Sequence, residues 1–291
     1  MISASTRSSA SGFDGRRGPN ELPLYLNYRK MIENKVVDSL PCFLTLVSTF
    51  SKQWKEYWVD KQRQKRGEEA WAAAWLPWFR GEDSAAWLLS GSTALQPKLY
   101  RNSFESKLIL DLEAEMRVEF RRRGAQLLTE RSTPIDKWEW YFLMQHYGAP
   151  TRLLDWSDAA LVGLHFAVSK RGRNSDKNAD ADAAVYMLDP WWLNGNAFKE
   201  VSQVADEYHS LGPALPDWDE AKPYLTDDEF ENDELGVKCP LAIDPSHFSR
   251  RFAAQRSCFT IFGRDTDGLR CVCQQFRCSF SEIRREERGY Y

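Results

Sequence analysis

The spacing of hydrophobic positions first predicts a long helix near the N-terminal end of the chain. Apolar residues recur every three or four positions and so share one helical face, at Phe43, Leu46, Val47, Phe50 and Trp54. Pro41 stands just ahead of this run, and the first turn of a helix accepts proline because its amide groups need no partner within the helix. We therefore expect a helix from about residue 41 to residue 65.

Two further helices are predicted before the middle of the chain. Asn102 and Glu105 have the spacing of a capping box, and a helical face follows at Ile109, Leu112, Met116 and Phe120. Farther on, Thr133, Pro134 and Asp136 stand in the order of an N-cap, a first-turn proline and a first-turn acid. The helix that they begin should end at Gly148, with His146 in its last turn.

Short apolar runs predict strands at residues 75–80, 183–189, 257–262 and 269–276. The first run ends at Gly81 and should deliver Arg80 to the strand end, while Pro77 indicates an edge strand or a strand start. Residues 158–167 predict a helix of small apolar residues, capped by Ser157, that can pack closely against a sheet.

Predicted helices come first in the chain, and the predicted strands are distributed along the rest of it. No regular alternation of strand and helix is present. This order predicts a single α+β domain with N-terminal helices and a mixed or mostly antiparallel sheet. We expect residues 1–20 to form a disordered tail and residues 21–291 to form the domain. Within the domain, a polar loop at 171–182 and an acidic insertion at 205–238 are expected to be peripheral.

Composition is typical of a globular protein with a sizeable core, since 43% of the 291 residues are hydrophobic and 13% are aromatic. No run approaches the roughly 18 apolar residues that span a bilayer, and the N-terminus has no apolar signal-peptide core. We therefore expect a soluble, intracellular, cytoplasmic protein. The Ser-, Gly- and Arg-rich N-terminal residues fit a disordered tail better than a transit peptide.

The net charge of -3 conceals an uneven distribution, because residues 206–234 hold eleven acidic residues and one basic residue. The remainder is mildly basic, which suits an anionic ligand and equally suits a solvated surface of mixed charge. No basic stripe with interleaved aromatic residues indicates nucleic-acid binding. Cys271, Cys273 and Cys278 lack the Cys-x2-Cys spacing of zinc sites, so reduced thiols and no metal are expected.

Residues 145–157 contain the densest set of groups able to hydrogen-bond or ionise. Gly148 and Pro150 predict a sharp turn, which can present His146, Arg152 and Asp155 together. His146 fits either proton transfer or a bond to helix-end carbonyls. Asp155 and Arg152 fit either a structural ion pair or two ligand-facing groups, with the ion pair favoured for Asp155.

Other polar groups add to this set. The forked guanidinium of Arg80 can hold a phosphate or carboxylate at two points, and its alternative role is a surface salt bridge. Gln145, Thr151 and Gln255 can hydrogen-bond a bound group. Trp156 is interpreted as a packing anchor and His165 as a packed structural residue.

The same block resembles a known family. Residues 145–156 read Gln-His-Tyr-Gly-Ala-Pro-Thr-Arg-Leu-Leu-Asp-Trp, the upstream tripeptide is Phe79-Arg80-Gly81, and the small-residue helix ends in Phe166-Ala167. Together these motifs resemble the FRG domain over roughly residues 36–265. The resemblance identifies which part of the chain forms the domain, and it does not specify the reaction.

An enzyme acting on NAD is the first functional hypothesis, by analogy with the ADP-ribosyltransferase fold and its early Arg-Gly strand. In it, Arg80, His146 and Asp155 are the catalytic candidates, with Arg80 gripping the cofactor and the 151–157 turn shaping the nicotinamide pocket. Gln145, Thr151, Arg152 and Gln255 are the ligand-binding candidates. Such transferases commonly place a Glu near the position of Gln255, and none is present there, so either Asp155 takes its role or transfer is weak or absent.

Two alternatives remain. The first is a non-catalytic module that senses a nucleotide or an acidic protein partner through the same polar cleft, which the missing Glu favours. The second is hydrolysis through His146 and Asp155, which lacks a convincing nucleophile, because no Gly-x-Ser-x-Gly turn is present and Cys258 has no assigned base.

Overall fold

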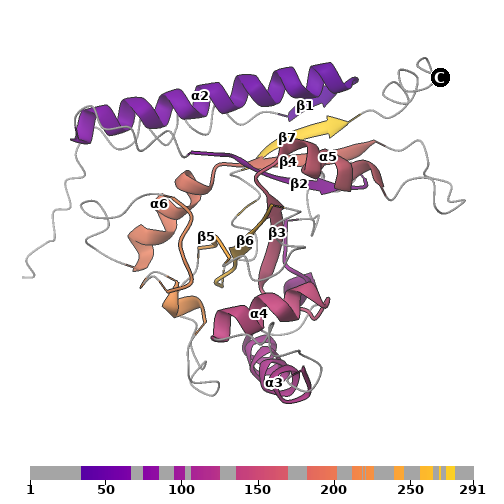
Figure 1. Cartoon of the computed structure of the whole chain (residues 1–291), viewed down its shortest axis with the longest axis vertical. Helices are drawn as coiled ribbons and strands as arrows, with labels where there is room; N and C mark the ends of the chain where they lie inside the picture. The colour runs from indigo at the N-terminus through magenta and orange to yellow at the C-terminus, as the bar shows by residue number, and fades with distance from the viewer. Residues whose placement is uncertain are drawn as a thin grey trace, which may run out of the picture.

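The computed structural model shows a seven-stranded sheet accompanied by five α-helices, so the predicted α+β class is confirmed. It describes residues 34–66, 75–84, 95–101, 106–124, 136–169, 182–201, 212–217, 219, 221–225, 239–245, 256–264, 269 and 273–278. None of the helices in these ranges is long and apolar enough to cross a membrane. Figure 1 shows how helices and sheet are arranged.

The sheet has the strand order β1-β7-β4-β2-β3-β6-β5. The strands are β1 (Asn34–Val37), β2 (Trp78–Glu82), β3 (Leu153–Ser157), β4 (Ala183–Leu188), β5 (Leu241–Ile243), β6 (Ser257–Ile261) and β7 (Cys273–Cys278). β1 and β7 are parallel, and every other neighbouring pair is antiparallel. The prediction of a mixed, mostly antiparallel sheet is therefore confirmed.

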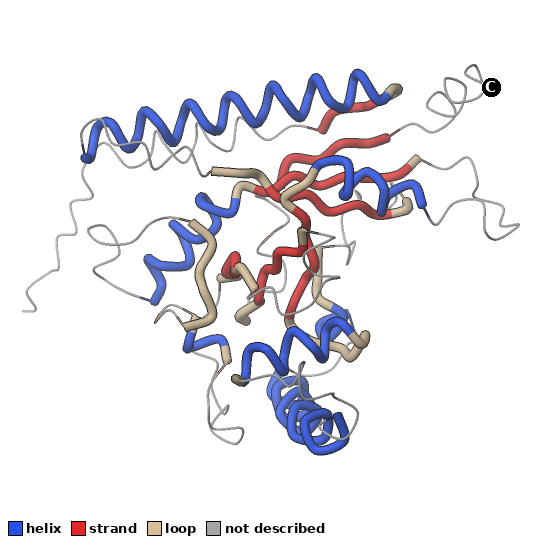
Figure 2. The backbone as a smooth tube through the Cα atoms, in the orientation of Figure 1, coloured by secondary structure: helices blue, strands red, loops and turns tan. Residues whose placement is uncertain are grey.

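Two half-sheets meet at a narrow joint in this sheet. β2 pairs with β4 over five positions, and β3 pairs with β6 over five positions. Between β2 and β3, however, the register contains the single pair Phe79 and Ser157. Figures 1 and 2 show β2 running across the view and β3 running down it. We call β1-β7-β4-β2 the first half-sheet and β3-β6-β5 the second half-sheet.

The first half-sheet is covered by α2 (Leu40–Arg66) and α5 (Ala160–Ser169), close to the ranges that the sequence predicts. Phe43, Phe50 and Trp54 of α2 join Val185 and Met187 of β4 in one buried cluster. At the end of β4, the buried Asp189 accepts hydrogen bonds from the indole groups of Trp58 and Trp75, at 2.7 and 3.1 Å. This carboxylate also accepts from the first amides of α6 (Pro190–Val201) and so fixes three segments together.

The second half-sheet packs against α3 (Ser106–Gly124) and α4 (Lys137–His146). Phe142 of α4 stacks on Phe259 of β6 with ring centroids 5.1 Å apart. Part of the acidic stretch belongs to this core as well, because Tyr224 and Leu225 are each 1% exposed and Ala214 bridges to Ile243. The expectation that this stretch is peripheral is wrong for these residues, since its apolar positions fill the core.

The ends of α4 test two turn predictions. Asp136, rather than Thr133, is the N-cap, and its carboxylate accepts the amide of Glu139 at 2.8 Å. The Thr133 prediction was wrong because Asp136 caps equally well and has a glutamate three residues later. The predicted end is confirmed, since Gly148 has φ of 83° and the amide of Ala149 bonds the Met144 carbonyl at 3.0 Å.

Some predictions fall outside the described residues: the Asn102 to Glu105 capping box, the 1–20 tail and nearly all of the 171–182 loop. β7 begins four residues later than the predicted 269. The extent of the domain along the whole chain stays a prediction.

β2 differs from its prediction in place and extent. It lies inside the sheet between β4 and β3, so the edge-strand alternative is wrong, whereas the strand start at Pro77 is confirmed because β2 begins at the next residue. Arg80 is the middle residue of β2 rather than its last. Gly81, interpreted as a strand end, instead allows a close approach of α5. A Cβ at Gly81 would lie 2.0 Å from the Gly163 carbonyl oxygen and 2.5 Å from the Ala167 amide. The predicted close packing of the small-residue helix is thus confirmed.

This contact makes Gly81→Ala a test of the fold. Because the added methyl group meets backbone atoms that cannot rotate away, we expect the free energy of unfolding to fall by about 3 kcal/mol or more in urea titrations. Gly124→Ala is the control, since its methyl group would meet the side-chain rings of Trp140 and Phe120, at 3.3 and 3.7 Å, and should change stability by less than about 1 kcal/mol. Equal stability of Gly81→Ala and the parent protein would contradict this packing.

Candidate functional site

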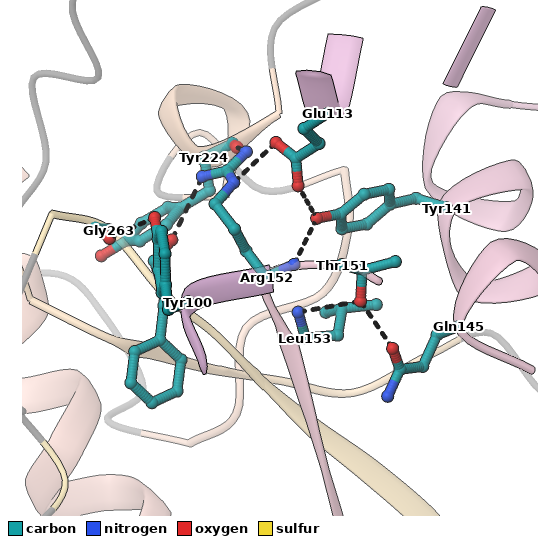
Figure 3. A network of polar contacts seen from close by, with 10 residues as sticks. Tyr100, Glu113, Tyr141, Gln145, Thr151, Arg152, Leu153, Tyr224 and Gly263 are labelled. Atoms are coloured by element: carbon teal, nitrogen blue, oxygen red, sulfur yellow. Dashed lines mark hydrogen bonds and ion pairs between the residues drawn. The ribbon is translucent and has the colours of Figure 1, made fainter. Parts of the chain in front are cut away.

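Arg152 lies at the centre of a buried polar network between the second half-sheet and α3. Its side chain is 1% exposed. Nε donates to the Glu113 carboxylate at 2.7 Å, Nη1 to the Phe262 carbonyl at 3.1 Å and Nη2 to the Tyr224 carbonyl at 2.6 Å. Figure 3 shows these contacts converging on the guanidinium from several segments. Arg152 therefore joins helix, strand and loop through its charge.

Tyr141 of α4 completes the network. Its hydroxyl donates to the other Glu113 oxygen and accepts the amide of Arg152 at 2.8 Å. Burial opposes the charge of Arg152, but the neighbouring Glu113 outweighs it, and the pKa of Arg152 is raised. Burial, and then Glu113, raise the pKa of Tyr141. Both groups therefore keep their protons, and the guanidinium remains a fixed cation.

Two interpretations of Arg152 from the sequence are therefore corrected. A guanidinium with three internal partners and almost no exposed surface is structural and does not face a ligand. It also pairs with Glu113 of α3 rather than with Asp155. The reason is geometric, because residues three apart in an extended chain point to opposite faces.

Asp155 is exposed on β3, and a relay of hydrogen bonds holds its carboxylate. The Thr151 hydroxyl accepts the amide of Leu153 at 3.1 Å and donates to the Gln145 side-chain oxygen at 2.6 Å. The Gln145 nitrogen then donates to Asp155 Oδ2 at 2.7 Å. Figure 3 shows Thr151 between Leu153 and Gln145. Thr151, which is fully buried, thus orients Gln145, and Gln145 orients Asp155.

Arg80 reaches this relay from the other side of the joint between β2 and β3. Its Nη1 donates to the Asp155 carbonyl at 2.9 Å, and its Nη2 forms an ion pair with Glu82 at 2.5 Å. Both side chains are largely buried, at 15% and 13% exposed. The structure therefore brings together Arg80, Gln145 and Asp155. We call these three residues, with Glu82, the Asp155 cluster.

Two charged residues near this place were missed in the sequence. Glu82 could have been found, because it lies two residues after Arg80 and so shares its face of β2. Arg101 ends the short helix η3 (Lys98–Arg101) and has no motif to mark it. Burial and the charge of Arg80 lower the pKa of Arg101, whereas Glu82 and Asp155 raise it.

The other candidates have separate positions. His146 is half-buried at the end of α4, with its ring edge-on to Tyr147 at 5.3 Å. His165 is exposed, so its interpretation as a packed residue was wrong. Trp156 is a packing anchor as predicted, being 3% exposed and bonded to Thr260 at 3.1 Å. Gln255 lies outside the described residues.

Nucleophilic and metal chemistry find little support among the described residues. Cys258 is 5% exposed, and burial raises the pKa of its thiol, which disfavours the reactive thiolate. No group of three potential metal ligands occurs in the ranges that the structure describes. What the Asp155 cluster offers is an exposed, oriented carboxylate beside guanidinium groups.

The Arg152 network can be tested through stability. Glu113→Leu leaves a buried guanidinium without its counter-ion, and we expect a loss of about 3–5 kcal/mol in the free energy of unfolding. The double variant Glu113→Leu/Arg152→Met should lose less than the sum of the two single variants, because no unpaired charge remains. Glu119→Gln, in a surface ion pair with Arg122, is the control and should change stability little. Additive losses would contradict the coupling.

Comparison with known proteins identifies a family model for part of the chain. Residues 76–176 match the family model of the FRG domain, a shorter span than the resemblance in the sequence suggested. Neither the curated proteins nor the solved structures gave a match to the chain, so the analogy with ADP-ribosyltransferases stays a proposal. The matched span runs from the start of β2 past the end of α5 and contains the whole Asp155 cluster. Over residues 76–176, this chain therefore carries an FRG domain.

Proposed function

We propose that the FRG domain binds a nucleotide of the NAD type at the Asp155 cluster and cleaves the bond between its ribose and nicotinamide. One observation carries this proposal: the exposed Asp155 carboxylate has one oxygen held by Gln145 and lies on a residue whose carbonyl is held by Arg80. A carboxylate that a neighbouring amide already orients, on a backbone that Arg80 holds, needs little reorganisation when positive charge develops beside it.

The reaction needs such a carboxylate. When the glycosidic bond breaks, its electron pair leaves with nicotinamide, and C1′ of the ribose acquires oxocarbenium character. The negative charge of Asp155 stabilises this centre. Water, or a hydroxyl or amine of an acceptor, then attacks C1′ and loses a proton to solvent, which gives ADP-ribose or an ADP-ribosylated product.

Arg80 has a positioning role in this proposal. Its guanidinium already bonds Glu82 and the Asp155 carbonyl, so it fixes the strand that carries the carboxylate. Its ion pair with Glu82 also leaves Asp155 as the exposed carboxylate of the cluster. The sequence hypothesis that Arg80 grips the cofactor is replaced here by a contact that orients Asp155.

A second candidate function is binding without turnover, in which the cluster senses a nucleotide. It is favoured by the commitment of Glu82 to Arg80, because a single exposed carboxylate gives less charge stabilisation than two. The absence of a glutamate between residues 245 and 264 points the same way. The two candidates differ in one measurable quantity, the release of nicotinamide.

The experiment uses the full chain with NAD and follows both binding by calorimetry and nicotinamide release. Asp155→Asn keeps the shape of the side chain and removes its charge, so we expect release to fall by about 100-fold or more, with a smaller change in affinity. Asp111→Asn, an exposed carboxylate on α3, is the matched control and should behave as the parent protein.

Each outcome decides between the candidates. Release that depends on Asp155 supports the enzyme, and saturable binding without release supports the sensor. Release that survives in Asp155→Asn removes this residue from the mechanism. A parent protein that neither binds nor cleaves NAD overturns both candidates.

A further inference from the structure

Arg117 of α3 is a buried cation that has no partner in the part of the chain that the structure describes. The residue is 6% exposed. Nε and Nη2 of its guanidinium are both buried, and neither donates a hydrogen bond to a described residue. Buried polar groups in folded proteins are nearly always hydrogen-bonded, and an unpaired buried charge strongly destabilises a fold. Arg117 therefore indicates a ligand outside the Asp155 cluster.

Arg117 lies on the face of α3 that is turned toward α4. Residues three or four positions apart share a helix face, so Arg117 shares its face with Glu113 and Phe120. Glu113 bonds the hydroxyl of Tyr141 of α4, and the ring centroids of Phe120 and Trp140 lie 6.3 Å apart. The contacts one turn before and one turn after Arg117 thus both reach α4, which places Arg117 at the interface of the two helices.

The charge of Arg117 is not balanced by the buried carboxylates. Both oxygens of Glu113 are already bonded, one to the Tyr141 hydroxyl and the other to Nε of Arg152, with which Glu113 forms an ion pair. The other buried carboxylate in the described ranges, Asp189, accepts indole and backbone N–H groups at the end of β4. Around α3, the described buried residues thus supply two guanidinium groups and one carboxylate, and one positive charge remains.

The two unpaired nitrogens belong to one edge of the guanidinium. The N–H bonds of Nε and Nη2 point the same way, so this edge can hold both oxygens of a carboxylate. Two other arginines of the chain use it in this manner. Nε and Nη2 of Arg122 bond the two oxygens of Glu119 at 2.9 and 2.7 Å, and the same atoms of Arg256 contact the two oxygens of Asp158. One carboxylate would therefore satisfy both unpaired nitrogens of Arg117.

We propose that Arg117, between α3 and α4, binds the carboxylate of a small organic acid. One negative charge balances the remaining positive charge, and the two oxygens accept from Nε and Nη2. The half-buried rings of Phe120 and Trp140, one turn away, offer apolar surface to the rest of the acid. Because 6% of Arg117 is exposed, the site borders solvent, and so small an opening favours a free acid over the side chain of a protein partner.

The test measures the melting temperature of the full chain near neutral pH, in sodium acetate and in sodium chloride of equal ionic strength. A ligand that binds only the folded protein raises this temperature. We expect acetate to raise it by about 2 °C or more relative to chloride in the parent protein, and not in Arg117→Met. Arg117→Lys keeps the charge without the two-nitrogen edge and should retain only part of the response.

Arg122→Met is the matched control, because it removes an exposed arginine from the same helix, and it should respond to acetate as the parent protein does. Inorganic phosphate is the comparison ligand. It carries about 1.5 to 2 negative charges near neutral pH, more than the one positive charge available, so the part of its response that depends on Arg117 should be smaller than for acetate.

An acetate response that is equal in the parent protein and in Arg117→Met overturns the inference. A response to phosphate that depends on Arg117 and exceeds the response to acetate overturns the choice of a carboxylate. If Arg117→Met does not fold, Arg117→Lys takes its place, and an undiminished acetate response in that variant overturns the inference. Because these probes contain no nucleotide, the carboxylate site and the proposed NAD site stand or fall independently.

Discussion

The buried ion pair between Arg152 and Glu113 is the constraint on which the rest of the second half-sheet depends. Removing a guanidinium from water costs several kcal/mol unless charge and hydrogen bonds replace the solvent. Here the replacement comes from a carboxylate on α3 and from carbonyl groups of Phe262 and Tyr224. These partners are far apart in the sequence, so α3, β3 and two loops must assemble together. The position of Arg152 then fixes the strand that carries Asp155.

The block around residues 145–157 looks like a catalytic motif, yet most of its polar groups serve the architecture. Gly148 ends α4, Thr151 bonds Gln145, and Arg152 is internal. Each of these groups satisfies another buried or backbone group, as buried polar atoms generally must. The outcome is a short segment in which several residues orient one exposed carboxylate.

Local patterns in the sequence predicted α2, α5, β4 and β6, because periodicity and small-residue spacing report directly on helices and strands. The resemblance to the FRG domain, rather than a local pattern, grouped Arg80 with Asp155 in one candidate site. Local patterns did not predict the pairing of Arg152 with Glu113, because the two residues are 39 positions apart and no short-range spacing relates them. For the same reason, the interior place of β2 became visible only in the folded chain.

The single Phe79 and Ser157 pair between β2 and β3 has a mechanical consequence. Strand ladders resist shear through many hydrogen bonds, and a ladder reduced to one rung resists rotation least. The joint is instead held by side chains, because Trp78 of β2 shares one buried cluster with Leu154 and Trp156 of β3, and by the bond from Arg80 to the Asp155 carbonyl. The relative orientation of the two half-sheets therefore depends on side-chain packing more than on the strand ladder.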